Sequence, residues 1–204
     1  AYYHPSQDDD VIQWMHMRRK ALGGYLPSRH SQNDPMSTPK RTSIEKFLSN
    51  SGKRQLSTTM SFVQIITNWL NDEGIKDRLI PIVADESRTF GMENLYKKIG
   101  IFSPEGQSYT PVDHNQLLPY LESETGQMMQ EGINEAGAMA TWLAAATSYS
   151  HSQQAFLPMY IYYSMFGFQR VGDLIWAAGD MRARGFLLGA TSGRTTLSGE
   201  GLQH

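Results

Sequence analysis

The sequence predicts an α/β fold with a parallel β-sheet and helices on both faces of that sheet. Residues 79–84 are apolar without alternation, as expected of a parallel strand that is covered on both faces. Segments of strand and helix character then follow one another along the chain. The chain starts without a methionine and stops shortly after a glycine-rich loop. We therefore expect an incomplete α/β domain that comes from a longer polypeptide.

Residues 1–55 differ in composition from the rest of the chain. A short helix is predicted at residues 11–21. The stretch "GGYLPSRHSQNDPMSTPKRTS" that follows is rich in glycine, proline, serine and asparagine, which is typical of a linker. We assign residues 1–55 to a linker with a short helix and residues 56–204 to the α/β domain.

The α/β domain is predicted to open with a helix and a strand. Serine and threonine at residues 57–59 are typical helix caps, and apolar side chains recur on one side of the helix that follows. The strand at residues 79–84 comes next and ends in Asp85 and Glu86. In open α/β sheets, ligands bind beyond the carboxyl ends of the strands, so these two carboxylates are candidates for a binding site.

Strand and helix alternate over the remainder of the chain. In chain order the sequence predicts a helical turn at residues 92–100, a helix at 127–146, a strand at 158–166, a helix at 169–181 and a strand at 185–191. The glycine-rich loop "SGRTTLSGEGLQH" follows the last strand. This alternation of strand and helix favours a parallel sheet with helices on both faces.

Composition excludes several classes of protein. The 204 residues are 40% hydrophobic and 19% charged with a net charge of −2, which is ordinary for a globular domain and does not suggest nucleic-acid binding. No apolar run approaches the roughly 20 residues of a membrane span, and the N-terminus lacks a signal peptide, so we expect a cytoplasmic protein. With no cysteine and six scattered histidines, we assign no metal ligands to this chain.

Two glutamates stand at the head of the predicted helix 127–146. On a helix, Glu131 and Glu135 would share one face, where like charges repel by about 0.2–0.5 kcal/mol. A carboxylate that is buried without a partner costs several kcal/mol. The commoner case is structural: the two glutamates lie on an exposed face or form an ion pair with a cation such as Arg88 or Arg170. The alternative is that one of them takes part in chemistry.

Two further stretches leave alternatives open. The block "YIYYSMFGFQR" crowds aromatic rings, and such clusters are more often core than binding site. An aromatic group facing a buried carboxylate would nevertheless form a slot for a planar heterocycle. The loop "TSGRTTLSGEGLQH" could hold a phosphate through its amides, but it matches neither the P-loop nor the dinucleotide motif, and its terminal His204 gains no role from pattern alone.

Four blocks of the sequence resemble a known family. They are "RLIPIVADESRTFGMENLYKKIGIFSPEGQSYTPVD", "QEGINEAGAMATWLAAATSYS", "YIYYSMFGFQRVGDLIWAAGD" and "GATSGRTTLSGEGLQH". They are similar to the middle, pyrimidine-binding domain of the homodimeric pyruvate dehydrogenase decarboxylating component, a thiamine diphosphate enzyme. "RRKALGGYLPSR" resembles the linker ahead of that domain, whereas residues 30–56 match poorly. The resemblance implies a fold related to the transketolase family.

The resemblance also implies roles for individual residues. Glu135 would hydrogen-bond N1′ of the thiamine pyrimidine and drive that ring toward its imino tautomer. Glu86 and His204 would be further catalytic groups that handle substrate and intermediates. The residues that would line the pyrimidine pocket are Tyr163, Phe166 and Arg170.

The cofactors and partners implied by the resemblance reach beyond this chain. The cofactors would be thiamine diphosphate and Mg²⁺, but the Gly-Asp-Gly block that holds the diphosphate and the metal in the family is absent from this sequence. The implied enzyme is a homodimer that decarboxylates pyruvate and reductively acetylates the lipoyl domain of the dihydrolipoyl transacetylase. Two alternatives are a related thiamine enzyme acting on another 2-oxo acid, and a non-catalytic interaction module with the same fold.

Overall fold

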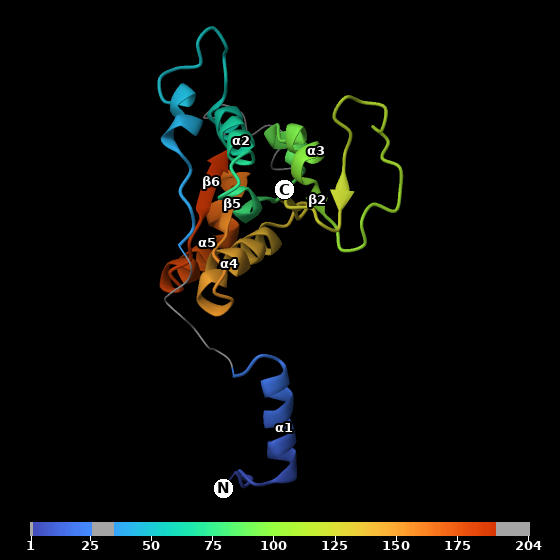
Figure 1. Ribbon diagram of the computed structural model, residues 1–204, viewed down its shortest axis with the longest axis vertical. Coiled ribbons are helices and arrows are strands. Elements are labelled where there is room, and N and C mark those ends of the chain that lie inside the picture. The colour runs from blue at the N-terminus through green and yellow to red at the C-terminus, as the bar shows by residue number, and fades with distance from the viewer. Residues whose placement is uncertain (1, 26–34, 191–204) are drawn as a thin grey trace.

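The structure is a computed structural model that describes residues 2–25 and 35–190 (Figure 1). Its α-helices are α1 (Asp10–Ala21), α2 (Thr58–Trp69), α3 (Tyr96–Ile99), α4 (Glu135–His151) and α5 (Ser164–Asp180). Its strands are β1 (Leu79–Val83), β2 (Ile101–Phe102), β3 (Glu122–Ser123), β4 (Met129–Gln130), β5 (Leu157–Tyr163) and β6 (Phe186–Ala190). Short 3₁₀ helices are η1 (Arg41–Ser43), η2 (Glu45–Phe47), η3 (Lys76–Arg78), η4 (Ser87–Phe90) and η5 (Glu93–Leu95).

The main sheet of the described residues has four parallel strands in the order β4-β1-β5-β6. β1 lies inside the sheet, where Ile82 pairs with Met129 of β4 on one side and with Tyr160 of β5 on the other. Leu187 of β6 continues this row beyond Tyr160. Because the strands are parallel, their carboxyl ends meet along one edge of the sheet, which is the edge where ligands bind in open α/β folds.

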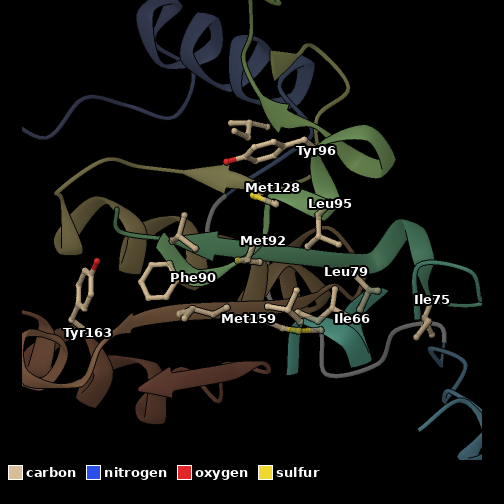
Figure 2. Close-up of a cluster of buried hydrophobic side chains, with 14 of the residues drawn as sticks. Ile66, Ile75, Leu79, Phe90, Met92, Leu95, Tyr96, Met128, Met159 and Tyr163 are labelled. Carbon is tan, nitrogen blue, oxygen red and sulfur yellow. The ribbon is translucent and has the colours of Figure 1, made fainter. Parts of the chain in front are cut away.

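Successive residues of the central strands point to opposite faces of the sheet and enter two separate cores. Leu79, Val83 and Met159 lie on one face of the sheet and pack there with residues of α2, η4, η5 and α3. Figure 2 shows Leu79 and Met159 in this cluster. Ile82 and Tyr160 pack against the other face with α4 and α5. The predicted parallel sheet with helices on both faces is therefore confirmed.

The start of α4 corrects the predicted helix at residues 127–146. Residues 129–130 form strand β4, which pairs with β1, and Gly132 adopts a left-handed backbone with φ of 67°. Helix α4 begins only at Glu135, because the side chain of Asn134 caps it there. Glu131 therefore lies outside the helix, and the expectation that Glu131 and Glu135 share one helix face is wrong.

The other predicted elements are confirmed with shifted ends. Ser57 caps α2 as expected, its side chain accepting a hydrogen bond from the amide of Met60. The predicted strand at 158–166 ends at Tyr163, because α5 follows it without a loop and takes in the residues after it. Val171 has non-helical angles and kinks α5 close to the predicted start of this helix at residue 169.

The N-terminal region bears out its predicted helix but buries nothing with it. Asp9 caps α1 by accepting from the amide of Val11, and basic residues occupy the last turn of the helix. No residue of α1 is buried, and Trp14 and Met15 are exposed. Within the described ranges, no helix has both the length and the apolar character needed to cross a membrane. The domain division near residue 55 stays a prediction.

Candidate functional site

Glu135 owes its position to the cap of α4. The side chain of Asn134 accepts a hydrogen bond from the amide of Gly137 at 2.9 Å, which fixes the first turn of the helix. Gly137 is needed for this contact, since a Cβ there would stand 2.4 Å from the Asn134 amide nitrogen. The turn directs Glu135 inward, and the residue is only 5% exposed. A nearly buried carboxylate thus lies at the helix N-terminus, where the backbone dipole favours negative charge.

Arg170 of α5 is the partner of this carboxylate. Its Nη1 donates to Oε1 of Glu135 at 2.9 Å, while the arginine side chain keeps a third of its surface exposed. The guanidinium also lies over the ring of Phe166, 4.5 Å from its centroid. Of the two arginines that the sequence offered as partners, Arg170 is the one that pairs, because Arg88 binds Asp113 instead.

An aromatic group continues from Phe166 to the end of β1. The rings of Phe166 and Tyr163 meet edge to face, with their centroids 6.5 Å apart. The centroid of the Tyr163 ring in turn lies 5.3 Å from that of Phe90. Figure 2 shows Tyr163 and Phe90 side by side at one end of the core cluster. The Tyr163 hydroxyl donates to Oδ2 of Asp85 at 2.7 Å. Glu135 is therefore linked through Arg170 and the aromatic rings to the carboxyl end of β1.

The carboxylates of Glu135 and Glu131 each use one oxygen and leave the other without a donor. Oε1 of Glu131 accepts from the hydroxyl of Thr141 at 2.6 Å, as Oε1 of Glu135 accepts from Arg170. Within the described part of the chain, no group donates a hydrogen bond to Oε2 of either glutamate. These oxygens are open acceptors on one buried residue, Glu135, and one half-buried residue, Glu131.

Tyr160 belongs to the same neighbourhood. It is fully buried, and its hydroxyl has no hydrogen-bond partner among the described residues. Burial raises the pKa of this phenol well above its ordinary value, and the nearby carboxylates of Glu135 and Glu131 raise it further. We call Glu131, Glu135, Tyr160 and Arg170 the Glu135 cluster.

A second polar group surrounds Gln130, the last residue of β4. Its Oε1 accepts from both the amide and the hydroxyl of Ser87, at 2.8 and 2.7 Å, and its Nε2 donates to the hydroxyl of Tyr120 at 3.1 Å. The Tyr120 hydroxyl donates a hydrogen bond to Oε1 of Glu122 at 2.9 Å, and the hydroxyls of Tyr96 and Ser87 are hydrogen-bonded at 3.0 Å. We call these five residues the Gln130 network. It ties residues 120–122 to the end of β1.

The structure brings together four of the six predicted site residues. Glu135, Arg170, Phe166 and Tyr163 form the continuous set of contacts described above, and their roles toward a cofactor stay predictions. Glu86 is exposed beyond the end of β1, and its side chain makes no hydrogen bond or ion pair with a described residue. His204 lies outside the described residues.

The analysis of the sequence gave no specific role to four residues of this edge. Asp85 stands next to the chosen Glu86 at the strand end, and only the structure shows that it is the one bound to Tyr163. Phe90 carries no local signal, because its contact with Tyr163 joins segments far apart in the sequence, and the bond of Thr141 to Glu131 depends on the turn between β4 and α4. Asn134 could have been found, since an asparagine ahead of an alanine-rich run is a typical helix cap.

The fold and this edge define the class of the protein, an α/β domain of the thiamine diphosphate-binding type. The family follows from sequence comparison: the model of the pyruvate dehydrogenase E1 component middle domain matches residues 41–204. The chain belongs to this family, as the resemblance of its sequence blocks predicted.

Curated relatives agree with the family. The chain is 53% identical over 203 residues to the pyruvate dehydrogenase E1 component of Corynebacterium glutamicum, which covers all of this chain and 22% of that protein. It is 56% identical over 192 residues to the Escherichia coli K12 protein of the same name, covering 94% of this chain and 22% of the relative. The Pseudomonas aeruginosa protein of that name is 52% identical over 203 residues, again all of this chain, and 23% of the relative is covered. The chain thus spans little more than a fifth of these relatives.

Proposed function

We propose that this chain is the pyrimidine-binding part of a thiamine diphosphate-dependent pyruvate dehydrogenase E1 component. The observation that carries the proposal is the state of Glu135: it is 5% exposed, Arg170 binds one of its oxygens, and no described residue donates to the other. A buried carboxylate with an open oxygen suits a ligand that presents a ring nitrogen. Relatives named as pyruvate dehydrogenase E1 components support the same assignment.

The residues present fit an aminopyrimidine ring. Glu135 would hold a ring nitrogen at its open Oε2, and the flat rings of Tyr163 and Phe166 offer apolar surface to a planar heterocycle. Arg170 is braced against Phe166 and holds the Glu135 carboxylate through Oε1. The fit thus rests on an acceptor oxygen, an aromatic surface and a fixed cation, all contributed by α4, α5 and the end of β5.

The chain's own part in the reaction is the handling of one proton. When bound, thiamine diphosphate supplies a nucleophilic carbon and an electron sink for cleavage next to the keto group of a 2-oxo acid. Glu135 would carry the proton exchanged at its Oε2, and Arg170 would keep the carboxylate from turning away. Tyr163, anchored to Asp85, and Phe166 would exclude water from this oxygen.

The remaining parts of the proposed enzyme lie beyond this chain. We assign the diphosphate and Mg²⁺ ligands to the rest of the polypeptide, because the chain spans only 22% of its relatives and lacks the Gly-Asp-Gly block of the family. Pyruvate as substrate, the lipoyl domain of the transacetylase as acceptor, and a homodimer of the full chain belong to the same proposal. So does a cytoplasmic location, with which a chain free of cysteine is compatible.

The proposal is tested with the full-length protein that contains this chain. Calorimetric titration with thiamine diphosphate and Mg²⁺ should show saturable binding, and the loaded protein should decarboxylate pyruvate in preference to 2-oxoglutarate or a branched 2-oxo acid. Saturable binding with another preferred 2-oxo acid would establish the first alternative, a related thiamine enzyme. A protein that does not bind the cofactor at all would be an interaction module with the same fold.

A further inference from the structure

The hydroxyl of Tyr160 is a buried polar group that the proposed chemistry does not use. Tyr160 is 0% exposed, and its oxygen has no hydrogen-bond partner among the described residues. A hydroxyl taken out of water without a partner is destabilising, and the large majority of buried side-chain polar atoms in native proteins are paired with protein or with water. The position of this group therefore calls for a specific explanation.

Tyr160 lies beneath the first turns of α4. In the core on this face of the sheet it packs with Ala138 and Met139, which follow Glu135 by three and four residues. Residues spaced by three or four share one face of a helix, so Glu135 stands on the face of α4 that Tyr160 supports. Strand β4, which lies across β1 from β5, has Met129 in the same row as Ile82 and Tyr160 and leads into Glu131, whose amide donates to the carbonyl of Val83.

The electrostatic environment keeps Tyr160 a hydrogen-bond donor. Burial raises the pKa of the phenol, the charge of Glu135 raises it further, and Tyr162 and Glu131 add to the rise. The phenol therefore stays protonated throughout the physiological range. Each of the two carboxylates has an Oε2 that accepts from no described residue, so the Glu135 cluster combines one buried donor with two open acceptors.

We propose that Tyr160 is a positioning residue for Glu135. The Tyr160 hydroxyl holds the Glu135 carboxylate through one buried water molecule, and Glu131 binds the same water. A buried water usually makes about three hydrogen bonds, and a phenol with two carboxylates supplies that number. Arg170 restrains Oε1 of Glu135 and the water restrains the opposite side, so the carboxylate cannot rotate. This inference rests on the proposed function, because the carboxylate that the water orients is the one whose Oε2 would carry the proton.

The first test compares two tyrosine variants of the full-length protein loaded with thiamine diphosphate. Tyr160→Phe should slow the exchange of the C2 proton of the cofactor by about three- to tenfold, the rate equivalent of one neutral hydrogen bond, while the Kd for the cofactor stays near that of the parent. In the background of Glu135→Gln it should slow exchange no further. Tyr149→Phe is the control, since it removes another buried hydroxyl, one that donates to the Arg182 carbonyl. An equal loss of exchange in both variants would overturn the inference.

The second test uses the cofactor-free protein and does not depend on activity. If Tyr160 and Glu135 are joined through a shared water, Tyr160→Phe should shift the thermal midpoint less in the background of Glu135→Gln than in the parent. Additive shifts would overturn the inference. The two proposals fail separately: unchanged exchange in Glu135→Gln would reject the proposed function, whereas slow exchange in Glu135→Gln with normal exchange in Tyr160→Phe would reject the role of Tyr160 alone.

Discussion

The Gln130 network and the Glu135 cluster occupy the same carboxyl edge of the sheet and treat their polar groups in opposite ways. In the Gln130 network, the amide of Gln130 and the hydroxyls of Ser87 and Tyr120 all have partners within the chain. In the Glu135 cluster, two carboxylate oxygens and the Tyr160 hydroxyl find no donor or acceptor among the described residues. The Gln130 network thus satisfies its hydrogen-bonding groups internally, whereas the Glu135 cluster keeps unused hydrogen-bonding capacity among the described residues.

This difference separates polar side chains that stabilise the fold from polar side chains that are available to bind a ligand. A saturated buried network fixes one arrangement of the backbone and gains nothing from a further partner. A buried group with unused capacity is destabilising in the free protein and is expected at sites where a ligand completes it. Substitutions in the two groups should consequently fail in different ways, one in catalysis and the other in folding.

The largest effect is expected for Glu135→Gln in the complete enzyme. The amide is isosteric and can still bond Arg170 through its oxygen, but it cannot carry a proton, so turnover and C2 proton exchange should fall by about 100-fold or more. The thermal midpoint should stay near that of the parent. Deuterium-quench measurement of C2 exchange on the bound cofactor gives the result directly.

Glu131→Gln is the matched control for this prediction. Glu131 accepts from Thr141 and lies outside α4, so its amide variant should slow exchange much less than Glu135→Gln does. If Glu131→Gln proved the slower variant of the two, the acid-base role would belong to Glu131.

A smaller effect, and one on stability, is expected for Gln130→Leu. The change removes three hydrogen bonds and leaves Ser87 buried without its acceptor, which we expect to lower the free energy of unfolding by about 2–4 kcal/mol. Hydrogen exchange of the Ser87 amide in the full-length protein measures the loss locally. The exposed Gln116 provides the control, since Gln116→Leu should change stability by no more than about 0.5 kcal/mol. Normal protection of Ser87 in the Gln130 variant would show that the network does not hold this turn.

The smallest effect concerns the ion pair of Arg88 and Asp113 and depends on pH. The hydrogen bond from Arg88 holds the pKa of the Asp113 carboxyl below its ordinary value. A lowered pKa means that the pair stabilises the fold above about pH 4, where the carboxyl is charged in the folded and unfolded chains, and that this contribution disappears as the pH falls through the lowered pKa.

Limited proteolysis of residues 103–121 between pH 6 and pH 3 measures that contribution. Cleavage should accelerate in the acid range for the parent, because Asp113 also accepts from the amide of Tyr120 and thereby fastens this segment. In Asp113→Asn, cleavage should be faster at pH 6 and change less with pH. Identical pH dependence of cleavage in both proteins would show that Asp113 is not the group responsible for it.

The sequence predicted the sheet well because its central strands carry a strong local signal. The apolar run of β1 and the Ser57 cap of α2 are encoded within a few residues, and the structure has both. Strand β4 was missed because its two residues are fixed by pairing with Ile82 and Val83, which a local pattern does not reveal. That omission extended the predicted helix backward and placed Glu131 on it.

The site was predicted as a set of residues and not as an arrangement. Spacing alone left the partner of Glu135 open between two arginines, and it could not show that the Tyr160 hydroxyl lacks a partner among the described residues. Both facts depend on how α4 and α5 pack against β5. Long-range packing of this kind is settled by the whole fold and not by the residues near the site.

The direct passage from β5 into α5 limits how this part of the protein can change over time. Tyr163 ends the strand and also occupies the N-cap position of the helix, so Phe166 and Arg170 follow it at three and seven residues, close to one and two helical turns. An insertion or deletion of a single residue between Tyr163 and Arg170 would turn the arginine by about 100° around the helix axis, away from Glu135. Descendants of this chain can therefore vary side chains in the segment, but a change in its length would dismantle the site in one step.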